Sequence, residues 1–181
     1  MTSETTQSGM VTGLFPDRAS AESAYNSVSS RGYGKDDIHL IMSEEARKRH
    51  FSDDASGNTE LGNKAAKGAG VGGGIGATVG GVLAAIAAIG TSVAIPGLGL
   101  IVAGPLAAGI AGAGAGALTG GVLGALVGWG IPEEHVKRYE QGIKSGDILM
   151  GVKPRSSEDA AYFESEWNRT GREVYRGSAS A

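Results

Sequence analysis

The sequence has no cysteine, and over more than a third of its length it has no charge. The absence of cysteine from the 181 residues excludes disulfide bonds, thiolate metal sites and cysteine nucleophiles. Residues 68–132 contain no Asp, Glu, Lys or Arg, so all 16 basic and 19 acidic side chains lie outside this block. The formal net charge of −3 gives no basic surface for nucleic acid, and we expect no nucleic-acid partner.

The N-terminus also lacks the features of a secretory signal. Residues 1–9 are polar, with neither a basic region nor an apolar run. We expect these residues to form a disordered tail, and residues 177–181 to form a second one. The charged parts of the chain are therefore expected in the cytoplasm.

The segment before the uncharged block, residues 10–43, predicts a β-α-β unit. A strand is expected at Val11–Phe15, followed by an N-cap at Asp17, a helix to about Arg31 and a strand at 38–42. The small and apolar residues of the helix recur at helical spacing. They are Ala21, Ala24, Tyr25 and Val28.

The segment after the block, residues 131–176, predicts the same pattern with one additional helix. That helix opens at Pro132 with acidic residues in its first turn. A strand at 148–152, a helix after Ser156 and a strand at 172–175 follow. The expected buried faces of the two helices are Val136, Tyr139 and Ile143, and Ala160, Phe163 and Trp167.

Neither flanking segment is long enough to bury a stable core by itself. Together they supply the elements of an α+β domain, a ferredoxin-like split β-α-β sandwich. A polar connector (44–67), in which Glu44–His50 can add a helical turn or two, and the uncharged block interrupt this domain. Both flanks must then lie on the same side of any membrane.

Small residues recur at every fourth position in both halves of the uncharged block. A helical repeat of this kind forms one stripe on which a second helix can pack closely. The glycines of the two stripes, which we expect to be helix-packing residues, are Gly68, Gly72, Gly76, Gly80, Gly112, Gly116, Gly120, Gly124 and Gly128. The block (68–130) therefore predicts a glycine-zipper hairpin of two helices.

We call the two predicted helices the first arm (residues 68–90) and the second arm (residues 105–130). The first would be about 34 Å long, against about 30 Å of hydrocarbon in a bilayer. Between them, residues 91–104 are expected to be the hairpin turn because they contain Pro96, Gly97 and Gly99. Lys and Arg flank the block and are absent from this turn, which favours a bacterial inner-membrane hairpin with both termini in the cytoplasm.

Three further interpretations of the block stay open, one of which is an unstructured or aggregating segment. Helices this rich in glycine are unstable in water unless lipid or close neighbours surround them. A soluble homo-oligomer whose hairpins bury one another, in a cage, tube or filament, meets this need as well as a membrane does. The apolar turn is also compatible with a re-entrant hairpin.

Other motifs carry little chemistry. Residues 68–73 match G-x-G-x-x-G, but no strand precedes them and no acid follows at the required distance. His39, His50 and His135 are far apart, so no metal, cofactor, catalytic residue or small-molecule substrate is expected. Basic side chains near the block could contact anionic lipid headgroups or belong to a solvated face. They are Arg47, Lys48, Arg49, Lys64 and Lys67.

Five segments together resemble a bacterial family, the general stress protein 17M-like proteins of the low-temperature-induced type. The segments are Val11–Phe15, Gly34–Ile38, Ala94–Gly99, Gly130–Glu134 with Tyr139 and Glu140, and Gly146–Val152. The resemblance covers most of residues 10–176. It implies a stress-associated, membrane-linked protein and provides no catalytic residues.

The sequence therefore predicts a non-enzymatic stress-associated protein that is anchored in the membrane and self-associates through its glycine-zipper hairpin. Its partners would be other copies of the chain and membrane lipid. The alternative is a soluble structural protein in which the hairpins form the core of a homo-oligomeric assembly.

Overall fold

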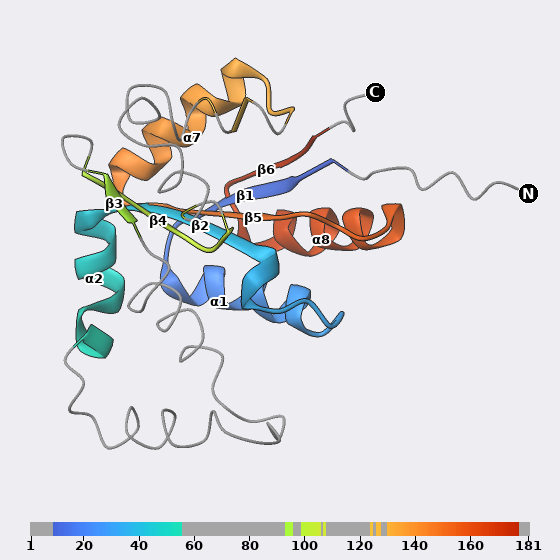
Figure 1. The fold of residues 1–181 in the computed structure, drawn as a ribbon, viewed down its shortest axis with the longest axis horizontal. Coiled ribbons are helices and arrows are strands. Elements are labelled where there is room, and N and C mark those ends of the chain that lie inside the picture. Colours follow the sequence, from blue (N-terminus) through green and yellow to red (C-terminus); the bar gives the residue numbers. More distant parts are fainter. Residues whose placement is uncertain are drawn as a thin grey trace, which may run out of the picture.

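The computed structural model describes residues 9–55, 93–95, 99–105, 107, 124, 126, 127 and 130–177. These residues form an α+β fold, in which helices and strands are interspersed along the chain (Figure 1). The strands are β1 (Val11–Phe15), β2 (Ile38–Ser43), β3 (Val93–Ile95), β4 (Leu100–Ala103), β5 (Ile148–Val152) and β6 (Glu173–Arg176). The helices are α1 (Arg18–Ser29), α2 (Glu44–Ala55), α7 (Glu133–Ser145) and α8 (Ser157–Thr170), with a short 3-10 turn at Lys35–Asp37.

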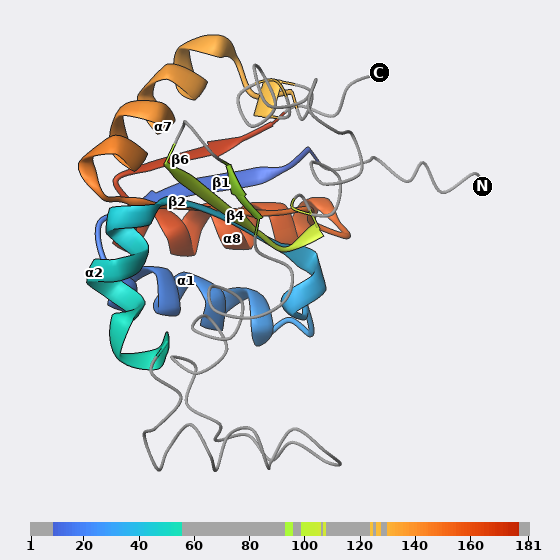
Figure 2. The same cartoon turned by 60° about the vertical axis from the view of Figure 1, so that its left-hand side comes forward.

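The six strands form a single sheet in the order β3-β4-β2-β5-β1-β6. Every neighbouring pair is antiparallel. The central strand β5 lies between β1 and β2, so the two halves of the chain interleave in the sheet. Helices α1 and α8 cover one face, and α7 covers the other (Figure 2).

The face covered by α1 and α8 holds most of the large apolar side chains. Trp167 and Phe163 of α8 and Phe15 of β1 are fully buried there, with the Phe15 and Trp167 rings edge to face at 5.5 Å. The indole Nε1 of Trp167 donates to the backbone oxygen of Ala24, 3.2 Å away. The predicted inner positions of both helices are buried, as expected.

The apolar cluster on the face covered by α7 is smaller than the cluster on the other face. It includes residues from both ends of the second arm. Val136, Tyr139 and Ile143 of α7 are buried as predicted. They share one apolar cluster with Ala107 and Leu126, which are 1% and 0% exposed. The second arm therefore begins and ends on this face of the sheet.

Local sequence signals explain how the helices start and stop. The Asp17 carboxylate accepts from the Ser20 N–H, and the Ser156 hydroxyl accepts from the Asp159 N–H, so both predicted N-caps are confirmed. Helix α7 ends at Gly146, whose φ of 100° is a conformation that glycine adopts readily. Gly142 lies inside this helix.

The expectation that residues 91–104 form only a turn between two helices is wrong. The structure has β3 and β4 in this segment, paired antiparallel to each other, with β4 also paired to β2. Gly99 does lie in the turn before β4, with φ 61°, whereas Pro96 and Gly97 lie outside the described residues. The apolar composition of this segment therefore reflects burial at one side of the sheet.

The predicted polar connector also contains more structure than expected. Its first part is the 12-residue helix α2, which follows β2 directly. Ala46 and Phe51 of α2 are buried in the same cluster as the side chains of α1 and α8. The rest of the connector, residues 56–67, lies outside the described residues.

Candidate functional site

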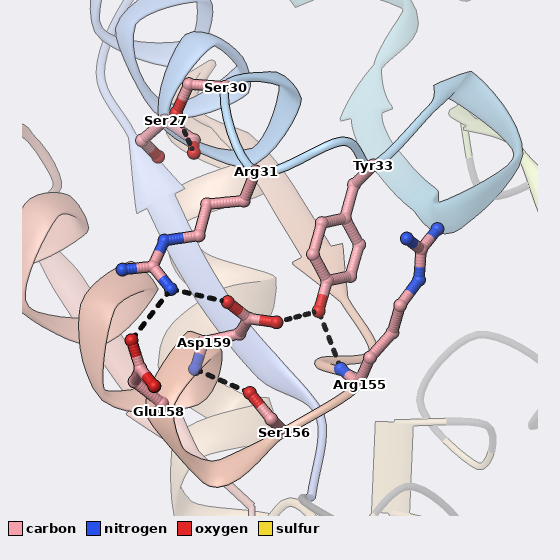
Figure 3. A network of polar contacts seen from close by, with 8 residues as sticks. All are labelled: Ser27, Ser30, Arg31, Tyr33, Arg155, Ser156, Glu158 and Asp159. Atoms are coloured by element: carbon pink, nitrogen blue, oxygen red, sulfur yellow. Dashed lines mark hydrogen bonds and ion pairs between the residues drawn. The ribbon is translucent and has the colours of Figure 1, made fainter.

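The largest network of polar side chains joins the two halves of the domain. It lies where α1 ends and α8 begins, and Figure 3 shows its side chains converging from these two elements. Arg31 and Tyr33 come from the first half, and Arg155, Glu158 and Asp159 come from the second. The partners of the contacts between the halves are 118 to 128 positions apart in the sequence.

Tyr33 is the centre of this network. Its hydroxyl donates to Oδ2 of Asp159 at 2.7 Å and accepts from the backbone N–H of Arg155 at 2.6 Å. Its ring is buried against Phe163, edge to face with 5.1 Å between the ring centroids. The guanidinium of Arg155 lies 4.2 Å from the centroid of the Tyr33 ring.

Two arginines complete the network with ion pairs. Arg31 Nη1 lies 2.8 Å from Oδ1 of Asp159 and 3.3 Å from Oε1 of Glu158. Arg155 Nη2 lies 2.9 Å from Oδ2 of Asp37, in the short turn before β2. Each charged group in the network therefore already has a partner of opposite charge.

The network changes the protonation behaviour of two of its members. The hydrogen bond from Tyr33, with further ones from Arg31 and Ser156, holds the pKa of Asp159 below its ordinary value. Burial raises the pKa of the Tyr33 hydroxyl. Both shifts favour the ionised carboxylate and the neutral phenol seen in the hydrogen-bond geometry.

This arrangement is better suited to holding the halves together than to chemistry. A general base works best when its pKa lies near the operating pH, and the pKa shifts of Asp159 and Tyr33 both lead away from neutrality. Here the phenol and the carboxylate are used in contacts with each other and with the arginines. We interpret the network as a structural clamp, and we call it the Tyr33 clamp.

A second polar group lies under α7. The Thr12 hydroxyl is 2.9 Å from the hydroxyl of Tyr139, and both residues are fully buried. Nearby, Oε1 of Glu173 is 3.0 Å from both Nδ1 of His135 and Nη1 of Arg138. These contacts attach α7 to β1 and β6. Burial raises the pKa of Tyr139, so the phenol stays neutral.

Two other groups have pKa values shifted by burial. His39 on β2 is largely buried, and this lowers its pKa to about 4, so the ring is neutral at pH 7. Burial raises the pKa of Asp147, at the start of β5, although Arg172 lies 3.5 Å away and opposes the shift. The described residues contain no group of three or more His, Asp or Glu side chains arranged to hold a metal ion.

Most of the predicted packing residues lie outside the described residues. This is true of Gly68, Gly72, Gly76, Gly80, Gly112, Gly116, Gly120 and Gly128, and of Lys64 and Lys67. Gly124 is described: it is helical and exposed, and a Cβ added there would meet no atom of the described residues within 4 Å. Across the described residues, no helix is both long enough and apolar enough to cross a membrane.

The predicted basic cluster does not form one free face. Successive residues of a helix point about 100° apart, and Arg47, Lys48 and Arg49 are all in α2. Lys48 forms an ion pair with Glu44 at 3.0 Å, and Arg49 lies over Gly146 at the end of α7. Lys48 and Arg49 are exposed and Arg47 is half-buried, so contact of this cluster with anionic lipid headgroups stays a prediction.

Sequence reasoning missed the Tyr33 clamp. The residues around Tyr33 in the sequence give no sign of its partners in the second half. The only local signal is the N-cap at Ser156, which orients the first turn of α8 and with it Asp159. Comparisons with protein-family models, with curated proteins and with solved structures found no match to this chain.

Proposed function

We propose that this chain is a non-enzymatic, stress-associated bacterial protein that self-associates through its two glycine-rich arms at the cytoplasmic side of the inner membrane. The folded domain would anchor the ends of the arms. The stress association and the membrane link rest on the sequence resemblance and on the glycine stripes. We further propose that β2, β5, β1 and β6 form a ferredoxin-like sandwich, because β1-α1-β2 and β5-α8-β6 interleave in that order.

The observation that carries self-association is the open surface at Gly124. An exposed glycine in a helix costs about 1 kcal/mol relative to alanine. Within the described part of the chain, no atom lies within 4 Å of where its Cβ would be. Packing against a second helix would make use of this open position, as small residues do in helix pairs that approach closely.

The positions of the arm ends limit how the arms can meet a membrane. Ala107 and Leu126 lie in one cluster on the sheet, with 18 residues between them. If the 18 residues folded back as two antiparallel helical segments, they would reach about 13 Å from the sheet. A bilayer core is about 30 Å thick. These lengths support a second arm that enters and leaves the membrane from one side, in place of a crossing.

Cell fractionation with a carbonate wash tests the membrane part of the proposal. A chain whose arms enter the lipid stays with the pelleted membranes, and quantitative release into the supernatant would contradict it. Sedimentation velocity on detergent-free material tests self-association separately. The double variant Gly116→Leu with Gly120→Leu should weaken association, and Ala117→Leu, which adds volume beside the stripe, is the control.

The second candidate function is a soluble structural assembly. It is favoured by β3 and β4, because the centre of the uncharged block belongs to the sheet and needs no lipid. In this case the carbonate wash releases the protein, and electron microscopy of detergent-free material shows uniform cages, tubes or filaments. Monodisperse monomer would exclude it.

A further inference from the structure

The end of the second arm is joined to α7 by a short hydrogen-bonded turn. The Gly130 N–H donates to the oxygen of Val127 at 2.9 Å, and the Ile131 N–H donates to the oxygen of Leu126 at 3.2 Å. Gly130 has φ 79°. This pair of bonds around a left-handed glycine is the Schellman ending of a helix. We call Leu126, Val127, Gly130 and Ile131 together the joint.

Side-chain packing holds the joint in addition to its hydrogen bonds. Leu126 and Ile131, the two side chains that such an ending brings together, are 0% and 1% exposed. The same contact occurs at the end of α1, where the Gly32 and Tyr33 N–H groups donate to Ser29 and Val28. There, too, the two outer side chains, Val28 and Tyr33, are buried.

Helix α7 begins directly after the joint. Pro132, with φ −60°, is its N-cap, and the Pro132 oxygen accepts from the N–H groups of His135 and Val136. One turn later, Tyr139 contacts Thr12 of β1, and His135 and Arg138 contact Glu173 of β6. A displacement of the last turn of the second arm is therefore passed to contacts on two strands.

We propose that the joint couples self-association at the second arm to the position of α7 on the sheet. This inference rests on the proposed function, because it needs the second arm to bind another copy of the chain. Association would restrict the last turn of the arm. Since two hydrogen bonds and the buried side chains of Leu126 and Ile131 connect that turn to α7, the contacts of α7 with β1 and β6 would then be restricted as well.

Hydrogen–deuterium exchange on the full chain tests this coupling. Concentrations above and below the association midpoint are first set by sedimentation velocity. In the parent chain we expect the amides of residues 133–145 to exchange about fivefold or more slowly in the associated state, the lower end of usual coupling strengths. Insertion of Gly-Gly-Ser between Gly130 and Ile131 should preserve association and abolish this difference.

Two further variants complete the design. Gly130→Ala strains the joint without lengthening it and should reduce the difference in α7 amide exchange between the two states. This variant tests the coupling if the insertion variant fails to fold. Gly-Gly-Ser inserted after Gly177 is the control and should behave as the parent chain does. Equal exchange of α7 in both states of the parent, or an undiminished difference in the insertion variant, overturns the coupling. A parent chain that stays monomeric in sedimentation overturns the proposed function, and this inference with it.

Discussion

The two faces of the sheet are built differently. The face under α1 and α8 is closed by large apolar rings, and its boundary is held by the Tyr33 clamp. The face under α7 has fewer large side chains, a buried pair of hydroxyl groups and the two ends of the second arm. The difference indicates that the first face supplies most of the stability, whereas the second face is where the arm connects to the domain.

The largest expected effect is on the first face. Trp167→Ala removes a fully buried ring and its hydrogen bond to Ala24, and should cost about 3–5 kcal/mol of unfolding free energy. Urea unfolding followed by circular dichroism measures this loss. Trp167→Phe, which keeps an aromatic ring, should lose less. A loss below about 1 kcal/mol for the alanine variant would show that this face does not dominate.

Removal of the central hydroxyl of the clamp should have the next largest effect. Tyr33→Phe leaves the Arg155 N–H and the Asp159 carboxylate without their partner, and should cost about 1–3 kcal/mol. Tyr162→Phe, on the same face, is the control. The urea midpoint of each variant gives the comparison.

The same variant should change how stability depends on pH. Because the pKa of Asp159 is lower in the folded chain than its ordinary value, its contribution is present at neutral pH and is lost as the pH falls. The Tyr33 hydrogen bond is the main cause of the shift. Tyr33→Phe should therefore lose less stability than the parent chain between neutral pH and acid, measured by urea unfolding at each pH. Equal losses would argue against the assigned cause.

A smaller effect is expected under α7. Tyr139→Phe removes the hydroxyl that contacts Thr12, and should cost about 1 kcal/mol, less than the clamp variant. The double variant with Thr12→Val removes both hydroxyls and should recover part of this loss. A larger loss for Tyr139→Phe than for Tyr33→Phe would reverse the assignment of the two faces.

The smallest effect should have the opposite sign. Gly124→Ala adds a methyl group in open space on a helix, and should stabilise the monomer by up to about 1 kcal/mol. Thermal unfolding at low protein concentration measures this gain. If Gly124 packs against another copy, the same change should weaken association in sedimentation velocity. A stabilised monomer with unchanged association would remove Gly124 from the packing surface.

The sequence was sufficient for those features that depend on neighbours along the chain. Asp17, Ser156 and the spacing of Val136, Tyr139 and Ile143 were enough to predict α1, α8 and α7, because caps and helical periodicity are local. The edge strand β3 and its neighbour β4 were not predicted, since short apolar runs do not distinguish a buried strand from a membrane segment. The Pro-Gly pattern between them indicated a turn but not which elements flank it.

The clamp could not be predicted for a related reason. Tyr33 and Asp159 are 126 positions apart, and neither residue type signals its partner. Their contact depends on β5 entering the sheet between β1 and β2. That interleaving brings the end of α1 and the start of α8 to one side of the domain, and it is a property of the whole fold.

One small contact near the chain ends has a practical meaning. The Gly177 N–H donates to the oxygen of Met10 at 2.8 Å, because β1 and β6 are neighbours in the sheet. Residues 10 and 177 could thus be connected by a short peptide, and the chain reopened within residues 56–92. In such a circular permutant, residues 56–92 would be divided between the two new chain ends. Each end could then be shortened while the strands of the sheet keep their connections.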